Sequence, residues 1–242
     1  MNKHLVSKEA LATVTRAQGA VRQYFYRATL PWGDNGDRIL GAAAFMDFSA
    51  TIASLKTDFD AAVEEFVTVK YPAERARAQF RMGDMFVAQD YPAPEELRAR
   101  FGISLSVHGI PTGADFRVQM KEDDAARIRQ EIDTHNAAKL GVAVKTLWDR
   151  VFSTVQHFAE RMEGDEKFKS ATIDNLYELV DDLPAMNITN DPNLTALHAE
   201  IKSRLGGLTA PELRKNTQLR AAARTDAQAI VSKITGIMSS FA

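Results

Sequence analysis

A run of apolar residues between positions 45 and 66 places the strongest constraint on how this chain can fold. The spacing alternates between three and four residues, which is the period of one face of an α-helix. It predicts a helix over residues 43–69 that ends before Pro72, because the residue preceding a proline is disfavoured in the helical conformation. The apolar positions are Phe45, Phe48, Ile52, Leu55, Phe59, Ala62 and Phe66.

A second long apolar stripe predicts another long helix over residues 122–162, and shorter helices are expected at 8–26, 72–87, 94–101, 170–183 and 192–205. One region alternates apolar and small polar residues as strands do, from Ile103 to Val107 and again from Phe116 to Met120, with glycines and a proline between. We therefore predict a mainly α (α+β) protein: a multi-helix domain with two long helices and one small antiparallel β-hairpin near 103–120, which is not an OB-fold.

The best candidate domain boundary is the polar, proline-containing stretch at 184–193. It predicts a helical core domain with the β-hairpin over residues 1–190 and a C-terminal helical arm over residues 191–242. Asp191 is the expected N-cap of the helix that Pro192 begins. Residues 210–241 are expected to form one amphipathic helix after an N-cap at Thr209. Whether this arm packs on the core or stands apart is left open.

The charged residues are distributed unevenly along the chain. The total of 30 basic and 32 acidic side chains gives a net charge of −2, but residues 1–30 carry +4 and residues 201–242 carry +5. Residues 31–66 carry −5 and residues 161–200 carry −6. Two interpretations remain open: the basic ends bind an anionic partner such as nucleic acid, or they pack against the acidic blocks of the same molecule or of a neighbour.

Several classes of function find no support in the sequence. The chain has no cysteine, which excludes disulfides, thiol nucleophiles and cysteine zinc sites, and its five histidines lack metal-ligand spacing. Glycine-rich phosphate loops and hydrolase nucleophile motifs are absent. We expect no catalytic residues, no metal, no cofactor and no enzymatic activity. Without an apolar run long enough to span a bilayer, we also expect no membrane partner and a cytoplasmic location.

Aromatic residues between arginines point to single-stranded nucleic acid, whose bases stack on rings while arginines hold its phosphates. The segment from Arg22 to Arg27 has three consecutive aromatic residues, which cannot all face one core, so at least one ring should be exposed. Alternatively, Phe25 is buried at a helix end with the tyrosines at its rim. Basic residues also flank the apolar stripe of the C-terminal helix. The residues nominated for nucleic-acid binding are Arg22, Tyr24, Tyr26, Arg27, Trp32, Arg214, Lys215, Arg220 and Arg224.

The segment Leu30-Pro-Trp-Gly-Asp-Asn-Gly-Asp-Arg38 contains Asn35-Gly36, a strong tight-turn dipeptide. Together with blocks such as Pro111–Val118, Leu147–Arg150 and Asp182–Thr189, it resembles a family of uncharacterised phage and prophage proteins over residues 25–205. The genes of that family often neighbour a MoxR-type ATPase. The chain also resembles the single-stranded-DNA-binding RNA polymerase cofactors of lytic phages that encode their own middle-gene RNA polymerase. That resemblance implies binding of single-stranded DNA, a phage RNA polymerase as partner and the host cytoplasm as location.

Two functions are therefore expected. The first is a single-stranded-DNA-binding accessory protein, a phage transcription cofactor that binds unwound DNA and assists a phage RNA polymerase. The alternative is a helical adaptor or assembly protein that binds a protein partner such as a MoxR-type ATPase. The phenylalanine-rich heptad at 45–66 motivates the alternative, since a heptad can pack against another chain as well as against its own core. A homo-oligomer is left open.

Overall fold

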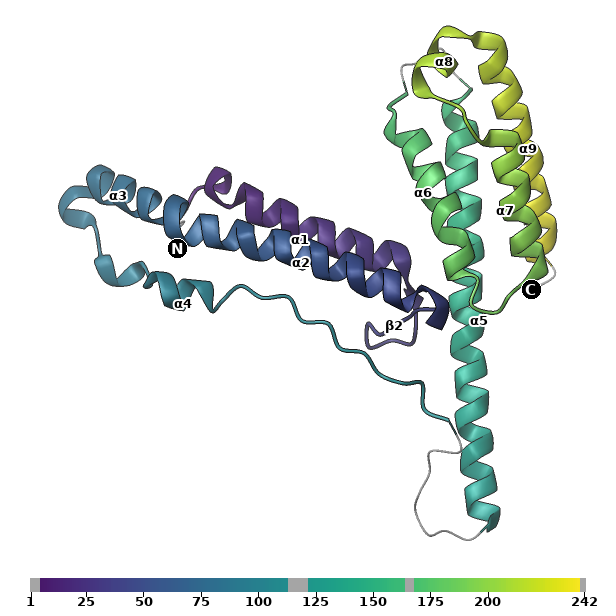
Figure 1. Cartoon of the computed structure of the whole chain (residues 1–242), viewed down its shortest axis with the longest axis horizontal. Helices are drawn as coiled ribbons and strands as arrows, with labels where there is room; N and C mark the ends of the chain where they lie inside the picture. Colours follow the sequence, from purple (N-terminus) through teal and green to yellow (C-terminus); the bar gives the residue numbers. More distant parts are fainter. Residues whose placement is uncertain (1–4, 113–121, 164–167, 240–242) are drawn as a thin grey trace. The chain divides into compact units, whose positions relative to one another are not determined.

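The fold is mainly helical with one small antiparallel β-hairpin, as the sequence predicts (Figure 1). The computed structural model describes residues 5–112, 122–163 and 168–239. It divides into two compact units, each with its own core. Unit 1 comprises Met1–Tyr26 and Met46–Gly109, and unit 2 comprises Arg27–Phe45 and Ile110–Ala242.

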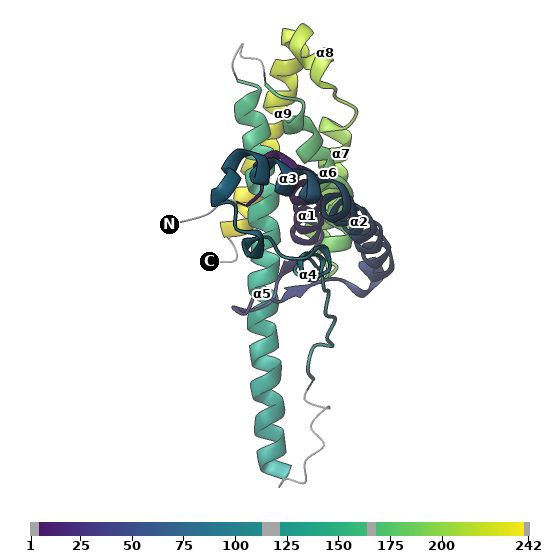
Figure 2. The same ribbon diagram turned by 90° about the vertical axis from the view of Figure 1, so that its left-hand side faces the viewer.

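Unit 1 is built on two helices that run side by side in opposite directions, α1 (Lys8–Ala28) and α2 (Phe45–Glu65) (Figures 1 and 2). Its core lies between these helices and those that follow, where Val14 of α1 packs among Phe59, Val63 and Phe66. Most of the predicted apolar heptad faces this core, although Phe45 at its start is 37% exposed. The remaining elements are the π-helical turn η2 (Phe66–Lys70), α3 (Tyr71–Met82), the 3-10 turns η3 (Gly83–Met85) and η4 (Ala88–Asp90), and α4 (Pro94–Arg98).

The helix containing the heptad does not end before Pro72, so this expectation from the sequence is wrong. Helical structure continues from α2 through η2 into α3, with Pro72 in the first turn of α3. A proline inside a regular α-helix lacks an N–H donor and collides with the carbonyl four residues earlier. The wider π-helical turn directly before Pro72 changes the hydrogen-bond register there, so the helix passes the proline without stopping.

Unit 2 is a helical bundle on the second half of α5 (Glu122–Arg161), with Trp148, Val151, Val155 and Phe158 completely buried. In Figure 1, α6 (Ala171–Met186), α7 (Pro192–Leu205) and α9 (Thr217–Met238) lie alongside this half of α5. The short α8 (Ala210–Lys215) joins α7 to α9. No residue in the first half of α5, residues 122–142, is buried.

The helix starts in the C-terminal region follow the expected capping chemistry, with one difference. The Asp191 side chain accepts a hydrogen bond from the Asn193 N–H at 2.8 Å, and Thr209 forms a capping box with Glu212. The single helix expected over 210–241 is instead two helices. The break lies at Asn216, whose side chain accepts a hydrogen bond from the Leu219 N–H and so begins α9 as a new helix.

The β-hairpin lies at 30–39 rather than near 103–120. Strands β1 (Leu30–Pro31) and β2 (Arg38–Ile39) pair Leu30 with Ile39, and Gly33 and Gly36 adopt positive φ angles in the turn between them. The tight turn expected at Asn35-Gly36 is therefore confirmed. Residues 103–112 form no strand, and the second predicted strand, 116–120, lies within 113–121, outside the described residues. Leu105 and Val107 are exposed, so these alternating apolar side chains do not pack on a core.

The division between the units does not follow the boundary expected at 190/191. Residues 191–239 belong to the same unit as α5 and α6, and the chain divides near residues 26, 45 and 109. The apolar stripe of α9 explains this difference: Ala227, Ile230 and Ile234 are fully buried in the core that α5, α6 and α7 share. The C-terminal helices are thus part of the bundle of unit 2.

Removing residues 206–242 should therefore unfold unit 2. In the full chain, Ile230→Ala should lower the free energy of unfolding by about 2–5 kcal/mol, because it leaves a cavity in a closed core. Gln228→Ala, an exposed position on the same helix, should change it by less than about 0.5 kcal/mol. Denaturant titration followed by tryptophan fluorescence measures both, since Trp32 and Trp148 belong to unit 2. A truncated chain that unfolds with the stability of the full chain would instead show that 206–242 is a separate arm.

Candidate nucleic-acid interface

One exposed aromatic ring lies beside an arginine on α1, within unit 1. The Arg22 guanidinium carbon is 5.7 Å from the centroid of the Tyr26 ring, one helical turn away. Tyr24 stacks on Phe48 of α2 with ring centroids 5.7 Å apart, and Phe25 also packs against Phe48. Tyr26 is 45% exposed, which confirms that the three consecutive rings cannot all enter the core.

Arg16 and Arg22 present further positive charge on the exposed side of α1. Both side chains are exposed, and neither forms an ion pair with a carboxylate in the part of the chain that the structure describes. Helix positions 15, 19, 22 and 26 share one face of α1, so Arg22 and Tyr26 lie one turn apart on that face. The small residue Gly19 lies on the same face, one turn before Arg22. This face could hold a phosphate at Arg22 and a base on Tyr26.

Arg27 belongs to unit 2 and has carboxylate partners in its own chain. Its guanidinium lies 3.0 Å from Glu178 and 2.9 Å from Asp182, both on α6. Trp32, in the hairpin turn, is half-buried, and the Lys139 ammonium lies 5.8 Å from its ring centroid. Arg27 and Trp32 are assigned to unit 2, and Arg22 and Tyr26 to unit 1.

The C-terminal arginines also interact within unit 2. Arg214 donates hydrogen bonds to the Phe168 carbonyl, the closer at 2.6 Å, and Arg224 lies 2.6 Å from Glu163. Arg220 is only 8% exposed, whereas Lys215 is exposed. For Arg27 and Arg224, the second interpretation of the charge distribution holds: they pair with acidic residues of the block 161–200.

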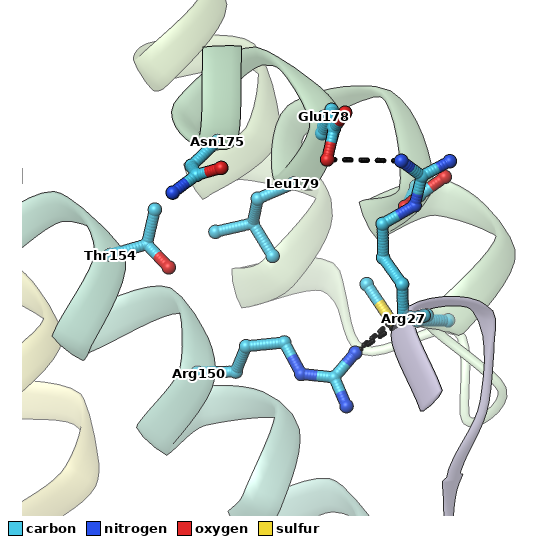
Figure 3. A pocket seen from close by; sticks show the side chains of 8 residues that line it. Arg27, Arg150, Thr154, Asn175, Glu178 and Leu179 are labelled. Atoms are coloured by element: carbon cyan, nitrogen blue, oxygen red, sulfur yellow. Dashed lines mark hydrogen bonds and ion pairs between the residues drawn. The ribbon is translucent and has the colours of Figure 1, made fainter. Parts of the chain in front are cut away.

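A hollow of about 210 Å³ lies between α5 and α6 around Arg27 (Figure 3). Figure 3 shows Arg27 facing Glu178 on one side of it, with Thr154 and Asn175 on the other. Burial raises the pKa of Asp182, and the neighbouring Arg27 opposes that shift. Both carboxylates that line the hollow, those of Glu178 and Asp182, form ion pairs with Arg27.

Arg150 is the residue of this region that the sequence analysis missed. Its guanidinium donates to the carbonyl oxygens of Arg27 at 2.7 Å and of Thr29 at 3.2 Å, and its burial lowers its pKa. Arg38 of the hairpin also donates to Thr29, through Nε to the hydroxyl oxygen at 2.7 Å. Arg150 therefore fastens the start of the hairpin to α5, whereas Arg38 links the two ends of the hairpin to each other. The position of Arg150 between the apolar residues Leu147 and Val155 was the sequence feature that could have indicated a partly buried, hydrogen-bonded arginine.

Comparisons with family models, with characterised proteins and with solved structures give no match for this chain. Within the described residues, no three His, Asp or Glu side chains gather as a metal site would require. No described helix combines the length and apolar character needed to cross a membrane. The resemblance to phage proteins accordingly stays a prediction from the sequence.

The carboxylate of Glu200 on α7 offers a test of the ion pairs that hold α9. It lies 2.6 Å from Lys233 and 3.1 Å from Arg204, and the hydrogen bond from Lys233 lowers its pKa below the ordinary 4.5. A lowered pKa in the folded state stabilises the fold above pH 4.5, and this stabilisation is lost as the pH falls through the folded-state pKa.

Glu200→Gln should therefore lower the free energy of unfolding at pH 7 by about 0.5–1 kcal/mol, and the difference from the unsubstituted chain should shrink below pH 4.5. Glu131→Gln is the control, because Glu131 pairs with Arg127 on the exposed half of α5 and should matter less. Denaturant titrations between pH 3 and 7 (roughly the range in which carboxylates titrate) provide the measurement. An equal effect of both substitutions at every pH would contradict this role of Glu200.

Proposed function

We propose that this protein binds single-stranded DNA as an accessory protein, using the exposed face of α1 in unit 1. The observation that carries the proposal is the pairing of Arg22 with the exposed ring of Tyr26. Arginine beside an exposed aromatic ring supplies both interactions that unpaired nucleic acid uses: an electrostatic contact to phosphate and a stacking surface for a base. Arg16 adds a further positive charge on the same helix.

The proposal favours α1 over the C-terminal helices because the arginines differ in what surrounds them. Arg224 on α9 has a carboxylate at hydrogen-bonding distance, and Arg214 on α8 donates to a backbone carbonyl. Arg27, at the end of α1, likewise pairs with Asp182 and is left out of the proposed contact. A phosphate would have to compete with these groups. At Arg22 no described carboxylate competes. The resemblance to phage transcription cofactors supports the finer proposal that the bound strand is unwound DNA at a promoter and that a phage RNA polymerase is the protein partner.

Arg22→Gln and Tyr26→Ala should each weaken binding to a labelled oligothymidine, measured by fluorescence anisotropy across a salt series. Loss of the stacked ring should cost about 1–3 kcal/mol, roughly a 5- to 150-fold rise in Kd. Loss of one phosphate contact should reduce the slope of log K against log salt by about 0.7. Arg127→Gln is the control, because Arg127 pairs with Glu131 on α5.

Three outcomes would overturn this proposal. The first is no binding at about 50 mM salt, and the second is binding that does not respond to salt. The third is binding that Arg224→Gln abolishes while Arg22→Gln leaves it unchanged, which would move the interface to the C-terminal helices. Circular dichroism of each variant separates a lost contact from a lost fold.

The structure removes one argument for the helical-adaptor alternative and supplies another. The heptad at 45–66 packs mostly into the core of unit 1, so it does not provide a seam for another chain. The first half of α5, however, carries Ala125, Ile128 and Ile132 at helical spacing with none of them buried. Such a stripe is a candidate contact for a protein partner, of which a MoxR-type ATPase is the one that the resemblance implies.

An adaptor that assembles through this stripe should form an oligomer whose mass is independent of concentration and unchanged by DNA. Ile128→Ser with Ile132→Ser should then convert it to monomers, since two apolar contacts at the centre of the seam are lost. Light scattering with and without oligothymidine measures the mass. A full chain that is monomeric at all concentrations, or an oligomer that the double substitution leaves intact, contradicts self-assembly through α5.

A further inference from the structure

Phe80 of α3 is the most exposed large apolar side chain in the described part of the molecule, at 94%. The packing of α3 accounts for this exposure. Tyr71 and Ala78 face the core of unit 1, and the 100° rotation per residue places Phe80 on the opposite side of the helix. A single exposed apolar side chain is common on protein surfaces, so the charges beside Phe80 must carry any argument for binding.

The neighbours of Phe80 leave its ring uncovered and surround it with positive charge. Ala73 and Ala76 share its face of the helix and are too small to shield it. Arg77 and Arg81, three residues before and one after, border the same face, and the Arg77 side chain is 78% exposed. The whole helix has three arginines and one glutamate, a net charge of +2.

The carboxylate of that glutamate, Glu74, is shared between a backbone N–H of α1 and Arg77. Its Oε2 accepts a hydrogen bond from the Ser7 N–H at 2.9 Å, which fastens the start of α1 to α3, and this bond lowers the Glu74 pKa. Its other oxygen lies 3.1 Å from Arg77, an exposed pair of the kind that contributes little. Arg81 forms no ion pair with a carboxylate of the described residues.

We propose that Phe80 is a stacking platform for an unpaired base and that Arg77 and Arg81 contact the flanking phosphates. The inference rests on the proposed function and gives unit 1 a second contact with the strand, on a different helix from Tyr26. A protein partner fits less well, because apolar interfaces gather several large side chains, whereas this face of α3 offers one ring between alanines and arginines. A single ring flanked by positive charge matches one base and its phosphates.

The experiment compares two strands of equal length, an oligothymidine and an abasic strand that carries phosphates without bases. The full chain should bind the oligothymidine more tightly, and Phe80→Ala should weaken that binding roughly 5- to 100-fold while changing affinity for the abasic strand little. Arg77→Gln with Arg81→Gln should weaken binding to both strands. Because the ring contacts almost nothing in the fold, Phe80→Ala should retain the stability of the full chain.

Met46→Ala is the matched control, since Met46 is another strongly exposed apolar side chain of unit 1 that lies outside the proposed contact. A second variant, Phe80→Trp, gives a direct signal: its indole fluorescence should be quenched by the oligothymidine and unaffected by the abasic strand. Full binding by Phe80→Ala without quenching in Phe80→Trp overturns the platform while leaving DNA binding through α1 intact. Absence of binding to either strand by the full chain overturns the proposed function itself.

Discussion

The burial of the apolar stripe of α5 between Leu147 and Phe158 is the interaction on which unit 2 depends. Helices α6, α7 and α9 and the strand residue Leu30 all pack against this stripe in one core. Burying Ile230 and Ile234 of α9 against it fixes the rotation of α9 about its own axis, so Arg224 and Lys233 must point toward Glu163 and Glu200. Hydrophobic packing thus decides which charges meet, and the ion pairs add to an arrangement already determined.

The same constraint changes the meaning of the charge distribution along the chain. Positive charge at 201–242 and negative charge at 161–200 are neighbours in the bundle, where Arg204 and Lys233 pair with Glu200 and Arg224 pairs with Glu163. Arg16 and Arg22 of α1 are different, because they have no such described partner. A charge count by segment cannot distinguish these cases, since it contains no information on which helices pack together.

Local patterns in the sequence predicted what local physics decides. The helical periods, the caps at Asp191 and Thr209 and the turn at Asn35-Gly36 all depend on residues within a few positions of each other, and the structure has them. The strand expected at 103–107 is absent, and the exposed Leu105 and Val107 show that alternation alone does not supply a core. Passage of the helix through Pro72 required a π-helical turn, which no spacing rule anticipates. Phe80 was indistinguishable from a core residue until the buried face of α3 was known.

Arginines that pair with a carboxylate and arginines without a described carboxylate partner differ in how readily they could bind a phosphate. An exposed pair such as Arg224 with Glu163 contributes at most about 1 kcal/mol, yet a phosphate replacing Glu163 would leave that carboxylate close to the negative strand. Repulsion from the whole block 161–200 would add to this cost and make unit 2 a poor surface for a polyanion. Unit 1 presents Arg22 with Tyr26 on α1 and Arg77 and Arg81 around Phe80 on α3. Unit 1 has acidic residues of its own on α2, but none of those described pairs with Arg22, so a phosphate at Arg22 would displace no carboxylate.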